Sequence, residues 1–483
     1  MNSSAPPVTP RSSSSPSDAA RRLLPWLVAV AFFMESLDTT ILNTAVPAIS
    51  SALGVSPLSM KAVLASYTLS LAVFIPISGW MADRFGTRRV FASAIGLFTL
   101  GSFLCGISGN IHLLVACRIL QGCGGAMMVP VGRLTLVRTF AKSDLLRTMS
   151  FVSIPALVAP MLGPIAGGLI VGYLHWRFIF FLNIPIGIAG LVLVYIHLPD
   201  YREETHPLDV VGLILFGSGI ALLSYVLEIF GEHTLSAGAL SGLLALSAVL
   251  LAGYGIHARS LAFPLLQLRL FSIRTFRAAV GGSFFTRLGI GGVPFLLPLL
   301  YQVGLGFTPI QSGLLVMPQA VAAMSMKMIM PQLLKRIGYR GVLISNTLII
   351  GVLLLVFATI GLRTPVWAIV LQAFVYGAFT SLQYTSMNTL VYADITEKET
   401  SSASSIASTV QQMAISFGVA LAGLATAFFI PSAHSAPVAM IHGIHEALIA
   451  LGILTIASTI VFQSLKSGDG DDVSQHKVLH PGG

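Results

Sequence analysis

Long apolar runs, separated by short polar segments, follow one another along most of the chain. A helix that crosses the hydrocarbon core of a membrane needs roughly 20 mostly apolar residues, and fourteen runs of this kind can be counted. The pattern therefore predicts an all-α integral membrane protein with fourteen transmembrane helices and both termini on the same side. The runs occupy approximately residues 24–49, 60–81, 88–108, 112–134, 148–172, 176–197, 208–229, 237–257, 274–300, 310–334, 342–362, 365–388, 404–429 and 442–465.

Composition supports a membrane protein and argues against a nucleic-acid partner. Of the 483 residues, 55% are hydrophobic and only 9% are charged, whereas a soluble protein is about a quarter charged. The formal net charge of +9 is spread over short loops, so we interpret it as a topology signal and expect membrane lipid, not nucleic acid, beside it. The three cysteines fall in predicted membrane helices, where we expect buried apolar side chains rather than disulfides.

The distribution of lysine and arginine predicts the orientation of the chain. Twenty of the 27 basic residues lie on the side of both termini and three lie on the opposite side. Because short cytoplasmic loops carry the excess of basic residues, both termini are expected to be cytoplasmic. Segments 1–22 and 467–483 are polar and are predicted to be disordered cytoplasmic tails. The other four basic residues lie inside predicted helices: Arg118, Arg133, Arg287 and Lys327.

A short repeat predicts how the helices are grouped. DRFGTR (Asp83–Arg88) follows the second predicted helix, and KRIGYR (Lys335–Arg340) follows the tenth, 252 residues later. An arginine, an apolar residue, a glycine and a second arginine recur in register. We therefore predict two six-helix bundles, residues 23–199 and 261–466, with an inserted helix pair at 200–260. Parallel halves of this kind hold their binding site between them, near the middle of the membrane.

The same loop belongs to a series of motifs along the chain. They are GWMADRFGTRR (Gly79–Arg89), RILQGCGGAMMVP (Arg118–Pro130), APMLGPIAGG (Ala159–Gly168), LDTTILNTAVPAI (Leu37–Ile49) and WRFIFFLNIPIG (Trp176–Gly187). In these motifs the chain resembles the major facilitator superfamily, and within it the fourteen-helix branch of drug:proton antiporters. The resemblance implies a major facilitator fold. It also implies a monomeric, multi-pass transporter of the bacterial inner membrane that exchanges protons for a small-molecule substrate without a cofactor.

Two of these motifs are candidates for conformational control. In the loop after the second helix, glycines allow close helix approach and a tight turn. Its charged residues either mark topology only or, as the resemblance implies, hold one conformation of the transporter. In the fifth helix, small residues four apart suit ordinary packing or, as the resemblance implies, a seal that prevents proton leak. The candidates are Gly79, Asp83, Arg84, Gly86 and Arg88 in the loop, and Gly163, Pro164, Gly167 and Gly168 in the helix.

Two acids in the first predicted helix are the strongest candidates for a proton site. An ionisable side chain inside the membrane is costly and by default functional. Glu35 and Asp38 are three residues apart, so they share one helix face, and burial with mutual repulsion favours a shared proton. The alternative is a static ion pair with a nearby arginine. Arg118 in the fourth helix is the candidate partner, and the resemblance implicates it in proton coupling.

The second half carries two cations inside its predicted helices. Arg287 aligns with Glu35 when the 252-residue offset is subtracted, and Lys327 lies in the tenth helix. Two such cations suggest a site for an anionic group on the substrate; alternatively, Arg287 neutralises Glu35 or Asp38 across the central cavity. Arg133 is expected instead to extend to the cytoplasmic interface. Polar residues that line the route or bond neighbouring helices complete the set: Gln121, Gln319, Gln383, Tyr384, Asn388, Gln411 and Gln412.

Neither a metal site nor an enzyme active site is expected. His434, His442, His445 and Glu446 cluster near the outer mouth, but their spacing matches no recognised zinc motif, and we interpret them as solvated loop residues. The sequence lacks the Walker pattern GxxxxGK[ST] and the zinc-protease pattern HExxH. An ATP-driven pump and an intramembrane protease are therefore disfavoured.

A secondary transporter is the leading hypothesis. It is a proton-coupled antiporter of the multidrug-efflux type that exports small organic molecules across the inner membrane by alternating access. One alternative is an exporter of anionic metabolites, such as organic acids or their metal chelates, that uses Arg287 and Lys327. A second alternative is a non-transporting membrane sensor, although that role leaves the charges in the middle of the membrane unexplained.

Overall fold

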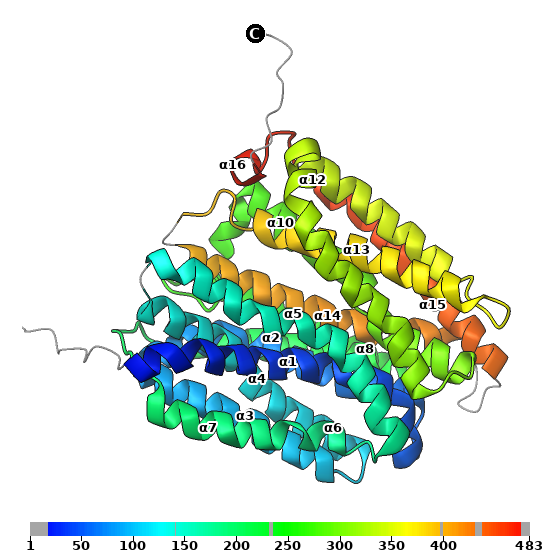
Figure 1. Cartoon of the computed structure of the whole chain (residues 1–483). Coiled ribbons are helices and arrows are strands. Elements are labelled where there is room, and N and C mark those ends of the chain that lie inside the picture. Colours follow the sequence, from blue (N-terminus) through cyan, green and yellow to red (C-terminus); the bar gives the residue numbers. More distant parts are fainter. Residues whose placement is uncertain (1–17, 141, 231–234, 397–398, 430–436, 475–483) are drawn as a thin grey trace, which may run out of the picture.

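The computed structural model describes residues 18–140, 142–230, 235–396, 399–429 and 437–474, and the regular elements in these ranges are all helical (Figure 1). The helices are α1 (Asp18–Leu53), α2 (Lys61–Phe85), α3 (Thr87–Ile107), α4 (Ile111–Thr139), α5 (Lys142–Tyr173), α6 (Phe178–Phe181), α7 (Asn183–His197), α8 (Val210–Ile229), α9 (Ala237–Ser260), α10 (Arg274–Ile290), α11 (Val293–Leu299), α12 (Pro309–Phe357), α13 (Val366–Leu390), α14 (Thr400–Phe429), α15 (Pro437–Phe462) and α16 (Asp471–Ser474).

All fourteen predicted crossings have a counterpart. Thirteen helical segments of the described residues are long and apolar enough to cross a membrane. One of them, α12, has 49 residues and would be about 73 Å long if straight, more than twice the thickness of a bilayer core of about 30 Å. Its backbone breaks at Gly338, where φ is 75°, so α12 supplies two crossings. An uninterrupted membrane helix satisfies its own backbone hydrogen bonds, which explains why apolar length is so informative here.

The helices are less continuous than the apolar runs indicate. The predicted run 274–300 contains α10, α11 and the start of a π-helical turn at Leu300–Gly304. The predicted run 176–197 contains the single turn α6 followed by α7. Segment 467–483, expected to be a disordered tail, includes α16, and the carboxylate of Asp469 accepts hydrogen bonds from Arg274 at the start of α10.

The helices pack in two groups with the inserted pair beside them. Helices α1 to α7 pack against one another, and so do α10 to α15. We call these groups the first half and the second half; in Figure 1 they are coloured blue to green and green to orange. The pair α8 and α9 packs together, and α8 also contacts α2 in the first half and α14 in the second. The inserted pair therefore covers one line along which the halves meet.

The two halves are in close contact at the end of the bundle that holds the last turns of α5 and the first turn of α12. We call this the closed end. A Cβ atom at Gly313 would lie 2.3 Å from the carbonyl oxygen of Pro164, and one at Gly168 would lie 2.5 Å from that of Pro309. Since so short a distance leaves no room for a side chain, glycine permits the two backbones to touch. The side chain of Gln302 also donates to the carbonyl oxygen of Thr44, at 2.9 Å.

Candidate functional site

A cavity of about 1350 Å³ lies between the two halves. Its wall is formed by α1, α2 and α4 of the first half, by α14 and the α10–α11 junction of the second half, and by segments 204–209 and 263–267, which lead into and out of the inserted pair. The lining reaches Asp83 at the end of α2 and Thr400 at the start of α14, away from the closed end. A cavity that is closed at one end and extends to the Asp83 loop at the other is the form expected of an alternating-access carrier that is open on the side of this loop.

Asp38 is held in a buried polar network beside this cavity. Its side chain is 1% exposed. The Oδ2 atom accepts a hydrogen bond from Nη1 of Arg118 at 2.6 Å, and Oδ1 accepts from Nε2 of Gln121 at 2.8 Å and from Nδ2 of Asn183 at 3.2 Å. These hydrogen bonds join α1, α4 and α7. In this conformation Asp38 is an ion-paired carboxylate, the arrangement that the alternative interpretation of the first helix predicts.

A further layer surrounds the Asp38 network. Ser102 of α3 accepts from Gln121 at 2.7 Å and from Asn183 at 3.1 Å, and the guanidinium carbon of Arg118 lies 4.2 Å from the ring centroid of Tyr67. Among the described residues, neither Nε of Arg118 nor the Tyr67 hydroxyl has a hydrogen-bond partner. Sequence reasoning did not single out Asn183, although it lies in the quoted motif Trp176–Gly187.

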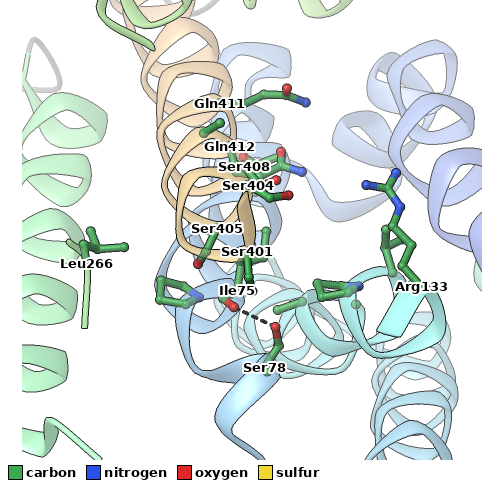
Figure 2. A pocket seen from close by; sticks show the side chains of 18 of the residues that line it. Ile75, Ser78, Arg133, Leu266, Ser401, Ser404, Ser405, Ser408, Gln411 and Gln412 are labelled. Carbon is green, nitrogen blue, oxygen red and sulfur yellow. Dashed lines mark hydrogen bonds between the residues drawn. The ribbon is translucent and has the colours of Figure 1, made fainter. Parts of the chain in front are cut away.

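Glu35 faces the cavity rather than the Asp38 network. It is half-buried on α1 and lines the cavity together with Arg133 of α4. Arg133 is near enough to act on the charge of Glu35, yet within the described residues neither side chain forms a hydrogen bond or an ion pair. The expectation that Arg133 reaches the membrane interface is therefore not met, because its side chain points into the cavity (Figure 2).

Arg287 turns towards its own half. It is 2% exposed, donates from Nε to Ser283 at 2.9 Å and from Nη2 to Asn388 at 3.3 Å, and lies 3.8 Å above the ring centroid of Tyr384. In the part of the chain that the structure describes, it forms no ion pair with Glu35 or Asp38. Of this group, Asn388 lines the cavity. The stacked and hydrogen-bonded guanidinium holds α10 to α13.

The other candidates of the second half have diverse positions. Lys327 is exposed on α12 and is not among the residues that line the cavity, so it is not brought together with Arg287. Gln383 is buried in a helix-to-helix network, accepting from Asn346 and donating to Thr347, each at 2.8 Å. Nε2 of Gln319 is buried without a partner among the described residues.

Serines that were not singled out form one side of the cavity. They lie on α14 at intervals of three and four residues, so they share one helix face, and the glutamines expected to line the route continue that face (Figure 2). No single serine is unusual in a membrane helix; only their common spacing signals a surface. We call this set the α14 stripe: Ser401, Ser404, Ser405, Ser408, Gln411 and Gln412.

The charged loop after α2 is tied to the segment that leads to the inserted pair. Nη2 of Arg138 lies 2.7 Å from Oδ1 of Asp83 and 2.7 Å from Oε1 of Glu203. The backbone amide of Arg88 donates to Oδ1 of Asp200 at 3.2 Å. Asp83 is therefore paired within the first half, and Glu203 shares the same arginine.

The histidines lie in a helix rather than in a loop. His442, His445 and Glu446 belong to α15, and Nε2 of His445 is 2.8 Å from the carbonyl oxygen of Ile360. His434 lies outside the described residues. The described part of the chain holds no group of three or more His, Cys, Asp or Glu side chains that could bind a metal ion.

Two helical halves around a central cavity form an arrangement that is typical of membrane transporters. Comparisons with known proteins identify the family of this chain. The family model described as "Major Facilitator Superfamily" matches residues 28–419, and the chain belongs to this superfamily. It is a multi-pass membrane transporter and not an enzyme.

Curated relatives extend over most of the chain. The protein named "Putative multidrug resistance protein MdtD" from Serratia proteamaculans (strain 568) is 42% identical over 424 residues, which is 88% of this chain and 88% of the relative. The protein of the same name from Escherichia coli (strain SMS-3-5 / SECEC) is 43% identical over 404 residues, 84% of this chain and 86% of the relative. The resemblance found in the motifs is thus confirmed along the chain.

Solved structures share the fold at low sequence identity. A bacterial homologue of the human lysosomal transporter Spinster, in an inward-facing and unoccupied conformation, has a TM-score of 0.66 at 14% identity and covers 93% of this chain and 97% of its own. A D-xylose–proton symporter has a TM-score of 0.65 at 15% identity and covers 93% and 99%. The major facilitator fold is therefore confirmed.

Proposed function

We propose that this protein is a proton-coupled antiporter that exports small organic molecules across the bacterial inner membrane, with both termini in the cytoplasm. The names of the relatives support an efflux role, and the excess of basic residues on the side of the termini supports this orientation. The observation that carries the proposal is the position of two carboxylates on α1. Asp38 is bound by Arg118 within the first half, and Glu35 faces the cavity one turn away.

The geometry suggests how a proton and a substrate compete. An ionised Asp38 holds Arg118 and so ties α1 to α4. A proton on Asp38 removes one charge of a buried pair, and the arginine left without its counter-ion must be compensated elsewhere. The charged or titratable groups that face Glu35 are Arg133, Asp38 and Tyr67. Glu35 is the carboxylate that a proton or a substrate in the cavity reaches first.

Alternating access then requires the closed end to open while the opposite end closes. The small residues Gly163, Gly167 and Gly168 allow α5 to lie against α1 and α12, and we assign the seal against proton leak to this contact. We assign the control of the opposite end to the loop Gly79–Arg88. The charged pairs of Asp83 and Arg138 are the contacts that would have to rearrange.

Proteoliposomes that contain a trapped pH indicator test the coupling. With an imposed proton gradient, addition of a transported probe such as ethidium should accelerate proton movement. We expect Asp38→Asn to abolish the acceleration and Glu35→Gln to reduce it at least tenfold. Arg259→Gln, an exposed position outside the cavity lining, is the control. Proton-driven export that survives Asp38→Asn and Glu35→Gln, singly and together, would show that the coupling site lies elsewhere.

A further inference from the structure

We propose that the cavity is built to bind a small zwitterion, a molecule that carries a carboxylate, an amine and further hydrogen-bonding groups. Arg133 would take the carboxylate, Glu35 the amine, and the α14 stripe the polar remainder. This inference rests on the proposed function, since it names the substrate class of the same cavity. It differs from an amphipathic cation, which would leave Arg133 facing a positive charge.

Arg133 is a cation of the cavity lining that forms no ion pair or hydrogen bond within the described residues. Its side chain is exposed to the cavity, and its guanidinium carbon lies 5.5 Å from the ring centroid of Phe32, which also lines the cavity. Arg138, five residues further along α4, is paired with both Asp83 and Glu203. The planar guanidinium of Arg133 can therefore donate two parallel hydrogen bonds to a carboxylate without breaking a hydrogen bond or ion pair to any described residue.

Glu35 is the complementary anion on the facing helix. Asp38, on the same helix, already bonds three side chains, whereas Glu35 has no hydrogen bond or ion pair within the described parts of the chain. Glu35 and Arg133 therefore provide two charged anchors of opposite sign in one cavity. They are close enough to interact, but they are not joined by a hydrogen bond or an ion pair within the described residues. A ligand with both charges satisfies both anchors, and a ligand with one charge leaves the other without a partner, which is costly away from bulk water.

The α14 stripe supplies the uncharged contacts. None of its six side chains donates or accepts a hydrogen bond within the described residues, and the hydroxyl of Ser405 is buried as well. Figure 2 shows the serines and glutamines of the α14 stripe along one wall of the pocket and Arg133 on the other side. Hydroxyl and amide groups both donate and accept, so this wall is suited to hydroxyl, amide or peptide groups of a ligand.

The charge of the ligand has a consequence for energetics. A zwitterion has no net charge, so its exchange for one proton carries one positive charge inwards. The exchange of a monovalent cation for one proton carries none. Export of a zwitterion should therefore accelerate when the membrane potential is made negative inside the compartment that receives the proton.

Matched chemical triads test the assignment. Each triad consists of an amino acid or dipeptide, its C-terminal amide, which is a cation, and its N-acetyl derivative, which is an anion. A panel of triads with aromatic, aliphatic and hydroxyl side chains is added to the purified full-length protein in nanodiscs, and binding is measured by isothermal titration. We expect at least one zwitterion whose dissociation constant is tenfold or more below those of both its derivatives.

Variants of the two anchors identify which group each one binds. Arg133→Gln should weaken binding of the zwitterion and of the N-acetyl derivative at least tenfold and leave binding of the amide unchanged. Glu35→Gln should weaken binding of the zwitterion and of the amide and leave binding of the N-acetyl derivative unchanged. Arg259→Gln should alter none of these dissociation constants. Thermal unfolding of each variant shows that the fold is retained.

Three results would overturn the inference: the amide binds most tightly in every triad, Arg133→Gln leaves the ranking unchanged, or no member of the panel binds. Ethidium that drives proton movement in vesicles while the panel fails would refute this inference alone and leave the proposed antiporter intact. Zwitterions that bind as expected but exchange with no protons would retain the binding assignment and refute proton coupling.

Discussion

Gly86 and Gly338 lie 252 residues apart in the sequence and share the same unusual backbone conformation, with φ of 97° and 75° and ψ of 141° and 165°. Each glycine ends one membrane crossing and begins the next, Gly86 between α2 and α3 and Gly338 within α12. Both belong to the short repeat DRFGTR and KRIGYR. The sequence repeat is therefore also a repeat of backbone geometry.

Replacing either glycine by alanine should destabilise the protein. This combination of positive φ and extended ψ is nearly restricted to glycine, and a side chain there costs about 1–3 kcal/mol. Gly86→Ala should cost more than Gly338→Ala, because its Cβ would also lie 2.2 Å from Oδ1 of Asp200. Thermal unfolding in detergent measures both.

Gly96→Ala is the matched control for these two variants. Gly96 lies inside α3 with no neighbouring atom within 4 Å of an added Cβ. Alanine should be neutral or stabilise by up to about 1 kcal/mol there, because it favours the helix over the unfolded chain. Gly86→Ala with the stability of Gly96→Ala would contradict the backbone argument.

The fold was predictable because the membrane restricts the options. Apolar length alone locates the crossings when every backbone polar group must be satisfied internally, and one repeated loop orders them into halves. The break at Gly338 lies in the predicted loop between the runs 310–334 and 342–362. The break at Gly291, inside the predicted run 274–300, was not predicted, because a change of backbone direction leaves the hydrophobic pattern unchanged. The repeat also gives the register of the backbone but not the direction of a side chain, and Arg287 accordingly points to Tyr384 and not to Glu35.

The candidate site was predictable only in part. Asp38 and Arg118 were found because ionisable residues inside a membrane helix are rare, and their contact is confirmed by a distance of 2.6 Å. Arg133 was misplaced, because sequence position near a helix end does not distinguish a side chain that reaches lipid from one that faces a cavity. The serines of the α14 stripe are individually ordinary, and only the tertiary structure shows that they share a wall.

The Asp38–Arg118 pair should behave as one unit in a double-mutant cycle. Breaking a buried ion pair by removing one partner costs about 3–5 kcal/mol, since it leaves the other charge uncompensated. Asp38→Asn and Arg118→Gln should each lower the free energy of unfolding by an amount of that order. The double variant should lose clearly less than the sum of the two, as measured by chemical unfolding in detergent.

Glu35→Gln provides the comparison for this cycle. Glu35 lies on the same helix, but its charge has no bonded partner within the described residues, so this variant should leave stability nearly unchanged. If the double variant loses as much free energy of unfolding as the two single variants together, Asp38 and Arg118 contribute independently to stability.

Asp209 should make stability depend on pH at the start of the inserted pair. It caps α8 by accepting from the amide of Gly212 at 2.7 Å, and it also bonds Nε2 of His257 at 2.8 Å and the amide of Leu265 at 3.1 Å. Burial raises the pKa of Asp209, but these hydrogen bonds together outweigh it and hold the pKa below the ordinary value of 3.8.

Because the pKa of Asp209 is lower in the folded than in the unfolded protein, its contribution is fully present above about pH 4 and is lost as the pH falls through the folded value. Asp209→Asn should therefore lower the melting temperature at pH 7, and the difference from the unmodified protein should shrink below pH 4. Melting curves of both proteins between pH 3 and 8 measure this. If the difference in melting temperature between the two proteins does not depend on pH, Asp209 stabilises the protein by capping α8 and not through its charge.

Gly313→Ala should weaken the closed end and shift the conformational equilibrium. Its Cβ would lie 2.3 Å from the carbonyl oxygen of Pro164, so α5 and α12 must separate where the halves now touch. Overpacking of this kind costs about 1–3 kcal/mol, and about 1.4 kcal/mol changes a population ratio tenfold.

Spin labels at Tyr173→Cys and Val366→Cys, both exposed, report the separation in a background without the three native cysteines. The distance distribution should gain a longer component in Gly313→Ala and remain unchanged in Gly238→Ala, where an added Cβ meets nothing within 4 Å. If Gly313→Ala folds and its distances match those of the parent, the contact at Gly313 does not control the closed end.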